Sequence, residues 1–241
     1  MGSLTDDPRW EAPPPLRFEI QLASLFFGAL DAFDVTTGIL RRRASQQAFN
    51  GLRFQMETVA LIGWMTEPTD PYRRQERAYR VLCGQITRYA RFLIRDAGRD
   101  REALQGVHKL RRWGERLREI AKQDGIEDLK QELGRPELLK RYGPKSGHPM
   151  FSMFSELGAH PSALGNLLFS LEAGSREITY VGQAVVARAS WCSAAVVFLW
   201  QTCEAMAKTL GWDDWLKEVV PIYNEAGPLM SEAVRRRNAL M

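Results

Sequence analysis

Cysteine, histidine and lysine are scarce in this chain, and their scarcity argues against several classes of protein. The 241 residues include three cysteines, three histidines and seven lysines. Cys83, Cys192 and Cys203 form an odd set without a C-x-x-C pair, which argues against a disulfide framework and against a thiolate zinc site. H-E-x-x-H, D-D-x-x-D, G-x-S-x-G, G-x-G-x-x-G and P-loop patterns are all absent. We therefore expect neither a metal site nor a cofactor.

Long apolar runs are also missing. The least polar run that we identify, residues 189–200, is shorter than the roughly 20 apolar residues that span a bilayer. The first 15 residues, MGSLTDDPRWEAPPP, are polar and proline-rich and contain no basic stretch leading into an apolar one. These features predict a cytoplasmic protein without a membrane partner.

The pattern that dominates the sequence is helical. Hydrophobic residues make up 45% of the chain and charged residues 26%, as in globular proteins. Apolar residues recur every three or four positions in the segments 16–43, 45–66, 72–97 and 100–123. The segment 183–210 is of low polarity throughout, which predicts a central helix. The sequence predicts an all-α fold: a flexible lead-in over 1–15, then a single helical bundle over 16–241 with six or seven main helices.

Shorter elements are expected between the main helices. Two short helices should follow Gly125, the second from Pro136 to Gly143, and a loop should cover 143–149. Two more short helices are expected at 150–160 and 162–171. Residues 176–181, REITYV, form the one credible strand, which cannot make a sheet alone.

Arginine is abundant where lysine is not. The chain has 26 arginines, and residues 72–122 hold 15 basic and 6 acidic residues, a local excess of +9 against +4 for the whole chain. Within this segment a stripe of arginines is separate from the apolar face: Arg77, Arg80, Arg88, Arg91 and Arg95. Such a stripe is typical of an anion- or nucleic-acid-binding surface, or of a solvated face in an arginine-rich protein.

Two polar pairs have the four-residue spacing that places side chains on one helical face. Arg53 and Glu57 lie where their helix becomes apolar on all sides, which predicts either a structural ion pair or an anion-binding arginine with an orienting carboxylate. Glu156 and His160 precede Pro161, and His160 is the best acid/base candidate among the three histidines, although a histidine in this position is more often a capping or core residue. We expect Arg53 and Glu57 to contact the helix that carries His160.

Three short motifs carry a family resemblance. R-x-x-x-E at Arg53 and Glu57, the segment YRVLC at 79–83, and S-x-x-x-x-H-P from Ser155 to Pro161 resemble an uncharacterised bacterial family of helical proteins. The resemblance implies a bundle in which Arg53, Glu57, Ser155 and His160 converge, and it implies no established activity.

The chain also resembles the higher-eukaryote-and-prokaryote nucleotide-binding (HEPN) bundles, whose ribonuclease members carry an arginine shortly before a histidine on one helix. Arg101 and His108 fit one helix, whereas Arg141 and His148 are separated by Gly143, Pro144 and Gly147.

Two functions from different classes follow. The first is a ligand- or partner-binding protein in which Arg53, Glu57, Ser155, Glu156 and His160 form an internal polar cluster. The alternative is a metal-independent ribonuclease of a defence or toxin system, with His108 or His160 as acid/base. We also expect a homodimer, because several large apolar residues point in different directions: Leu25, Phe26, Phe27, Leu30, Trp191, Phe198 and Trp200.

Overall fold

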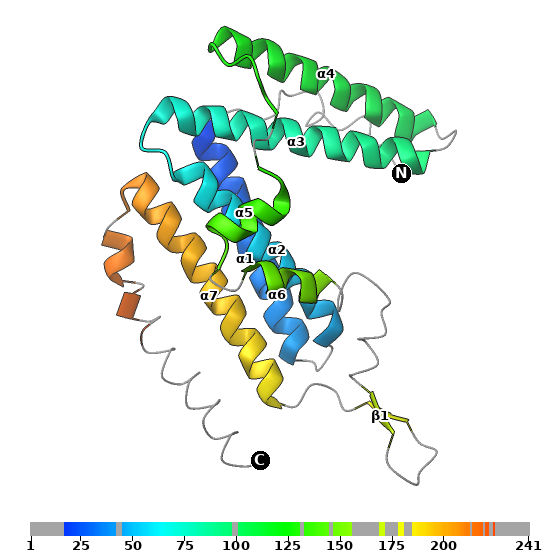
Figure 1. The fold of residues 1–241 in the computed structure, drawn as a ribbon, viewed down its shortest axis with the longest axis vertical. Helices are drawn as coiled ribbons and strands as arrows, with labels where there is room; N and C mark the ends of the chain where they lie inside the picture. The colour runs from blue at the N-terminus through cyan, green and yellow to red at the C-terminus, as the bar shows by residue number, and fades with distance from the viewer. Residues whose placement is uncertain are drawn as a thin grey trace. The chain divides into compact units, whose positions relative to one another are not determined.

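The fold is all-α, as predicted. The computed structural model describes residues 17–41, 45–97, 101–130, 133–144, 147–155, 169–171, 178–180, 185–212, 214–218, 220–221 and 224. Most of these residues are helical (Figure 1). The expected lead-in over 1–15 lies outside the described residues.

Seven helices are labelled in the described part of the chain, and the five long ones match the predicted helical segments. The seven are α1 (Phe18–Arg41), α2 (Ser45–Thr66), α3 (Pro71–Ala97), α4 (Arg101–Gln123), α5 (Arg135–Tyr142), α6 (Gly147–Phe154) and α7 (Val185–Leu210). Residues 214–218 are also helical.

The ends of α3 and α4 have identifiable caps. The Asp70 carboxylate accepts a hydrogen bond from the Tyr72 amide at 3.1 Å, and Pro71 takes the first helical position. After α4, Gly125 has φ +80°, and the Ile126 amide donates to the Ala121 carbonyl at 2.8 Å. This left-handed residue ends α4 and turns the chain back along α3.

Several of the short elements were predicted wrongly. Residues 126–130 are not helical, because the Lys130 amide bonds the Asp128 side chain and the Lys130 carbonyl accepts from Arg80. Helix α6 begins at Gly147 inside the expected loop, with Pro149 in its first turn. Phe169–Leu171, the last residues of the helix expected over 162–171, form strand β1, and residues 162–168 lie outside the described part of the chain.

That strand supplies the partner that the predicted strand lacked. Strand β2 (Ile178–Tyr180) lies within the predicted segment 176–181 and pairs antiparallel with β1, Phe169 opposite Tyr180. The two three-residue strands form a hairpin ribbon, a minor addition to the helical fold.

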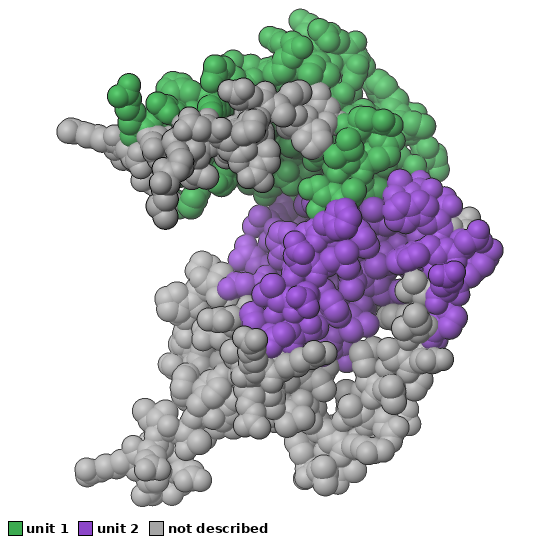
Figure 2. Space-filling model, turned by 180° about the vertical axis from the view of Figure 1, so that it is seen from behind, with its two compact units in different colours: residues 1–24, 67–134 green, residues 25–66, 135–241 purple. Residues whose placement is uncertain are grey.

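The chain divides into two compact units, coloured separately in Figure 2. Unit 1 comprises residues 1–24 and 67–134, and unit 2 comprises residues 25–66 and 135–241. A single domain over 16–241 stays a prediction, since a compact unit and an independently folding domain are different properties.

The core of unit 1 lies between α3 and α4, which run side by side (Figure 1). Leu82, Ile86, Leu110 and Leu117 are buried there, and Ile126 closes one end. Tyr89 and Leu104 continue the apolar spacing of these two helices, yet they are 50% and 40% exposed.

The core of unit 2 is built around α2, which packs against α5, α6 and α7. The rings of Phe49, Phe154 and Trp191 meet with centroids 5.3 to 5.7 Å apart. Helix α7 contributes the buried Phe198 and Cys203, and burial raises the pKa of the Cys203 thiol to about 11. That thiol is protonated and inert at neutral pH.

Helix α1 is less covered than a core helix. Its segment Phe18–Leu40 has the length and mean hydropathy, 1.3, of a membrane-crossing helix, and only 17% of its apolar window is buried. Residues 189–200, the run considered from the sequence, are not the ones that meet this test among the described helices. Because Asp31 and Asp34 lie in α1 and charges are costly inside a bilayer, we retain the prediction of no membrane partner.

Candidate functional site

The predicted ion pair on α2 is present, and a third charged residue joins it. Arg53 Nε lies 3.2 Å from Glu57 Oε1, and Glu57 Oε2 accepts a second ion pair from Arg135 of α5 at 3.1 Å. The Arg53 guanidinium also stacks over the Phe151 ring of α6, 4.8 Å from its centroid. The cluster therefore ties α2 to both short helices, with Glu57 holding two cations.

The rest of the predicted polar cluster is described only in part. The Ser155 hydroxyl donates to the Phe151 carbonyl at 2.8 Å, within its own helical turn. Glu156 and His160 lie outside the described residues, as does any contact they make. Arg53 meets α6 through Phe151, while the prediction that Arg53 and Glu57 contact the helix carrying His160 stays a prediction.

Arg135 and Phe151 were not predicted as members of this cluster. Each lies on a different helix from Arg53, so no spacing in the sequence connects them. Since every charged group of the cluster has a partner of opposite sign, the geometry is that of a structural ion-pair network.

The arginine stripe of α3 divides into two halves. In the first half, Arg80 is 8% exposed; it donates to Glu76 Oε1 at 2.6 Å and to the Lys130 carbonyl at 2.8 Å. Arg77 bonds Glu67 at 2.8 Å. The prediction that Arg80 lies on the solvated stripe is wrong, because Glu76 and the 126–130 segment enclose it.

Hydrogen bonds and opposite charges stabilise the side chains in the first half of the stripe. Burial alone would raise the pKa of the Glu76 carboxyl, but hydrogen bonds from Arg80 and Arg73 and their positive charges outweigh burial and lower it. Next to it, the Tyr79 hydroxyl donates to Asp124 at 2.5 Å, and burial together with that bond raises the Tyr79 pKa to about 12.

The second half of the stripe faces solvent. Arg88, Arg91 and Arg95 are all exposed. Two aromatic side chains lie among them, Tyr89 and Phe92, 50% and 49% exposed. Their rings are 6.4 Å apart between centroids and nearly parallel, at 13°, and the Arg95 guanidinium lies 5.7 Å from the Phe92 centroid.

Helix α4 adds further exposed cations next to α3. Arg91 of α3 and Arg111 and Arg118 of α4 line one cavity of about 210 Å³, whose apolar wall includes Ile86, Ile94 and Leu110. Glu115 is the acid among its lining residues. Three guanidinium groups from two helices thus share one cavity with a single carboxylate.

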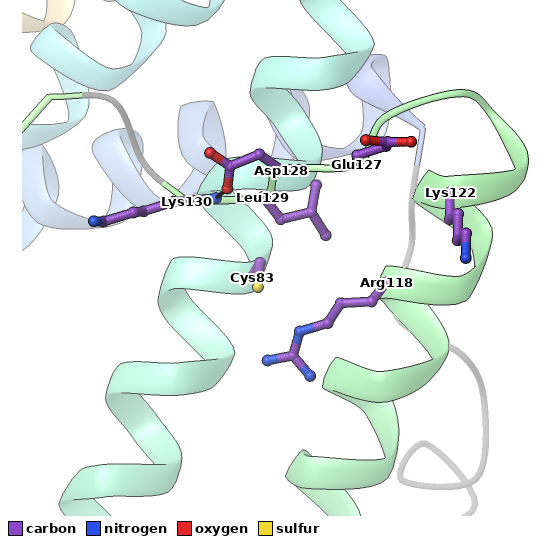
Figure 3. Close-up of a pocket in the computed structure, with 7 residues that line it drawn as sticks. All are labelled: Cys83, Arg118, Lys122, Glu127, Asp128, Leu129 and Lys130. Atoms are coloured by element: carbon purple, nitrogen blue, oxygen red, sulfur yellow. Dashed lines mark hydrogen bonds between the residues drawn. The ribbon is translucent and has the colours of Figure 1, made fainter.

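Arg118 also borders a second, larger cavity of about 640 Å³ at the other end of the hairpin core. Figure 3 shows Arg118 extending from α4 toward α3, near the Cys83 thiol, with Leu129 pointing into the same space. Lys122 and Lys130 add positive charge here, while Glu127 and Asp128 add negative charge. This cavity is electrically mixed and favours neither sign.

The described residues offer little support for a ribonuclease site. His108 is exposed on α4, as is Arg101, and His160 is outside the described residues. Within the part of the chain that the structure describes, no three His, Cys, Asp or Glu side chains gather in a way that would hold a metal ion.

Comparison with known protein families, with curated proteins and with solved structures gave no match. Both family resemblances read from the sequence therefore stay predictions.

Proposed function

We propose that this chain is a binding protein whose ligand is a polyanion, held on the exposed arginines of the α3–α4 hairpin. The observation that carries the proposal is the cavity lined by Arg91, Arg111 and Arg118. Cations brought together from two helices repel one another, and a bound anion relieves that repulsion.

The distribution of ion pairs supports this location. The first half of α3 has its cations neutralised by Glu67 and Glu76, and the α2 cluster has Glu57 between its two arginines. The second half of α3 and the adjoining turns of α4 expose seven arginines, of which Arg116 pairs with Glu119 at 3.2 Å. The other six are Arg88, Arg91, Arg95, Arg111, Arg112 and Arg118, and Glu115 is the other acid among the side chains described on those turns. Excess positive charge is concentrated at one surface.

This proposal changes the residues that we assign to ligand binding. Arg53 and Glu57 have the partners of a structural network, so the ligand site moves to the hairpin. The alternative, a ribonuclease that uses His108 or His160, remains a second prediction, and no described contact favours it.

Inorganic polyphosphate tests the proposal, because it offers charge without bases. Calorimetric titration at low salt should show binding, and its logarithmic affinity should fall linearly as the logarithm of the salt concentration rises. Arg91→Gln should weaken binding several-fold. Lys217→Gln is the matched control, since it removes the same charge from a side chain that is 75% exposed in unit 2.

Absence of binding at low salt, or equal losses in Arg91→Gln and Lys217→Gln, would reject the proposal. Equal losses would mean that the protein responds to net charge and not to the hairpin surface.

A further inference from the structure

The exposed second half of α3 combines arginines with half-exposed aromatic rings, an unusual mixture for a helix face that contacts only solvent. Arg88, Phe92 and Arg95 lie within one strip of the helix, with Tyr89 and Arg91 at its two rims, as 3.6 residues per turn requires. Solvated helix faces carry charges and short polar groups, whereas large aromatic rings left half exposed mark a contact surface. Two stacked, half-exposed rings among cations are a suitable contact surface for a partner that is both flat and anionic.

From this juxtaposition we infer that the polyanion is a single-stranded nucleic acid, whose bases stack on Tyr89 and Phe92 while its phosphates meet Arg88, Arg91 and Arg95. The inference depends on the proposed function and specifies its ligand. Proteins that bind single strands combine a basic track for the backbone with aromatic rings for the bases.

Ring geometry favours bases as the partner. The two rings are nearly parallel and stack with their centroids 6.4 Å apart, so a base can extend the stack at its ends. The Arg95 guanidinium lies over the Phe92 ring, so a base that stacks on that face would displace the guanidinium toward the base's own phosphate. Arg91 belongs both to this strip and to the arginine-lined cavity, which connects the two surfaces.

A duplex fits this surface less well than a single strand does. In a double helix the bases are stacked on one another and their faces are not available to protein rings. Sequence preference should be slight, because every base offers a π-face to an aromatic ring.

Two probes of equal charge separate stacking from charge attraction. A labelled thymidine 12-mer and an abasic 12-mer with the same phosphodiester backbone are titrated with the full chain, and fluorescence anisotropy reports binding. The thymidine strand should bind at least about tenfold more tightly, since two stacked bases each contribute measurably to affinity. The double variant Tyr89→Ala, Phe92→Ala should bind both strands with the weaker, abasic affinity.

Controls make a loss of binding specific to the rings. Trp212→Ala removes another exposed aromatic, 47% exposed and located in unit 2, and should leave the tenfold preference intact. Tyr89→Phe keeps the ring and should retain it too. An unchanged melting temperature of the double variant shows that its fold is preserved.

Other outcomes separate the base-stacking inference from the polyanion-binding proposal on which it rests. Equal affinity for both strands, together with polyphosphate binding, overturns the stacking inference and leaves the polyanion proposal standing. Binding to vesicles of phosphatidylcholine and phosphatidylserine without binding to the thymidine strand assigns the rings to a membrane surface and overturns the inference. Failure to bind any of these anions rejects both.

Discussion

At the scale of single residues, charge pairing decides which arginines serve structure and which are available. Arg80 and Arg91 are eleven residues apart on one helix, yet Arg80 is enclosed by Glu76 and a backbone carbonyl whereas Arg91 lines an arginine-rich cavity. Burying a charge is costly unless it is paired, so paired arginines contribute to a unique fold and exposed ones to binding.

Glu57 tests the structural half of this distinction. Glu57→Gln leaves Arg53 and Arg135 without their shared counter-charge, and we expect unfolding to become easier by about 1 to 2 kcal/mol. Glu137→Gln, on exposed surface beside Arg141, is the control and should cost less. Urea titration of both variants measures the difference, and equal costs would argue against a stabilising role for the Glu57 network.

Tyr79 gives a prediction about alkaline pH. The folded protein keeps the phenolic proton up to about pH 12, whereas the unfolded chain loses it near pH 10. Between these values the unfolded state binds fewer protons, so stability falls as pH rises. Tyr79→Phe should lower stability at pH 8 by about 1 kcal/mol and should remove this part of the alkaline fall. Chemical unfolding at pH 8 and pH 11 checks it, and an undiminished fall in the variant would contradict the assignment.

At the scale of elements, the sequence predicted the long helices well because their information is local. Apolar spacing, the Asp70–Pro71 start and the Gly125 stop define α3 and α4 without any knowledge of the fold. Segment 126–130 was predicted wrongly because its conformation depends on Arg80, about 50 residues away, which donates a hydrogen bond to the Lys130 carbonyl. The Arg135 and Phe151 contacts were missed for the same reason: they join elements that no periodicity relates.

The close approach of α1 and α2 is a further element-scale feature. A methyl group added at Gly51 would collide with the Thr36 side chain, which is fully buried. Gly51→Ala should therefore destabilise the protein by about 1 to 3 kcal/mol despite the better helix propensity of alanine.

Gly38→Ala is the matched control for that variant, since Gly38 lies in a helix and a Cβ added there would meet no other atom within 4 Å. It should be neutral or stabilising by up to about 1 kcal/mol. Thermal unfolding of the two variants decides the point, and similar melting temperatures would mean that the helices adjust without cost.

At the scale of the whole molecule, apolar surface remains where a partner could cover it. Phe27 is 62% exposed and Phe54 is 47% exposed, while Phe198, which we had placed in the same group, is buried. The homodimer stays a prediction, and we now expect its interface at the α1–α2 surface and not at α7. Light scattering at micromolar concentration should give about twice the 27.4 kDa of one chain. A mass of one chain that does not change on tenfold concentration would exclude the dimer.

The central claim is that the α3–α4 hairpin is the polyanion-binding surface, and arginine footprinting tests it most directly. The protein is treated with phenylglyoxal with and without inorganic polyphosphate, and mass spectrometry measures modification at each arginine. We predict that polyphosphate protects Arg88, Arg91 and Arg111, while Arg17 and Arg141, 78% and 58% exposed elsewhere on the chain, react as before. Unchanged modification of the hairpin arginines under conditions where polyphosphate binds would contradict the account.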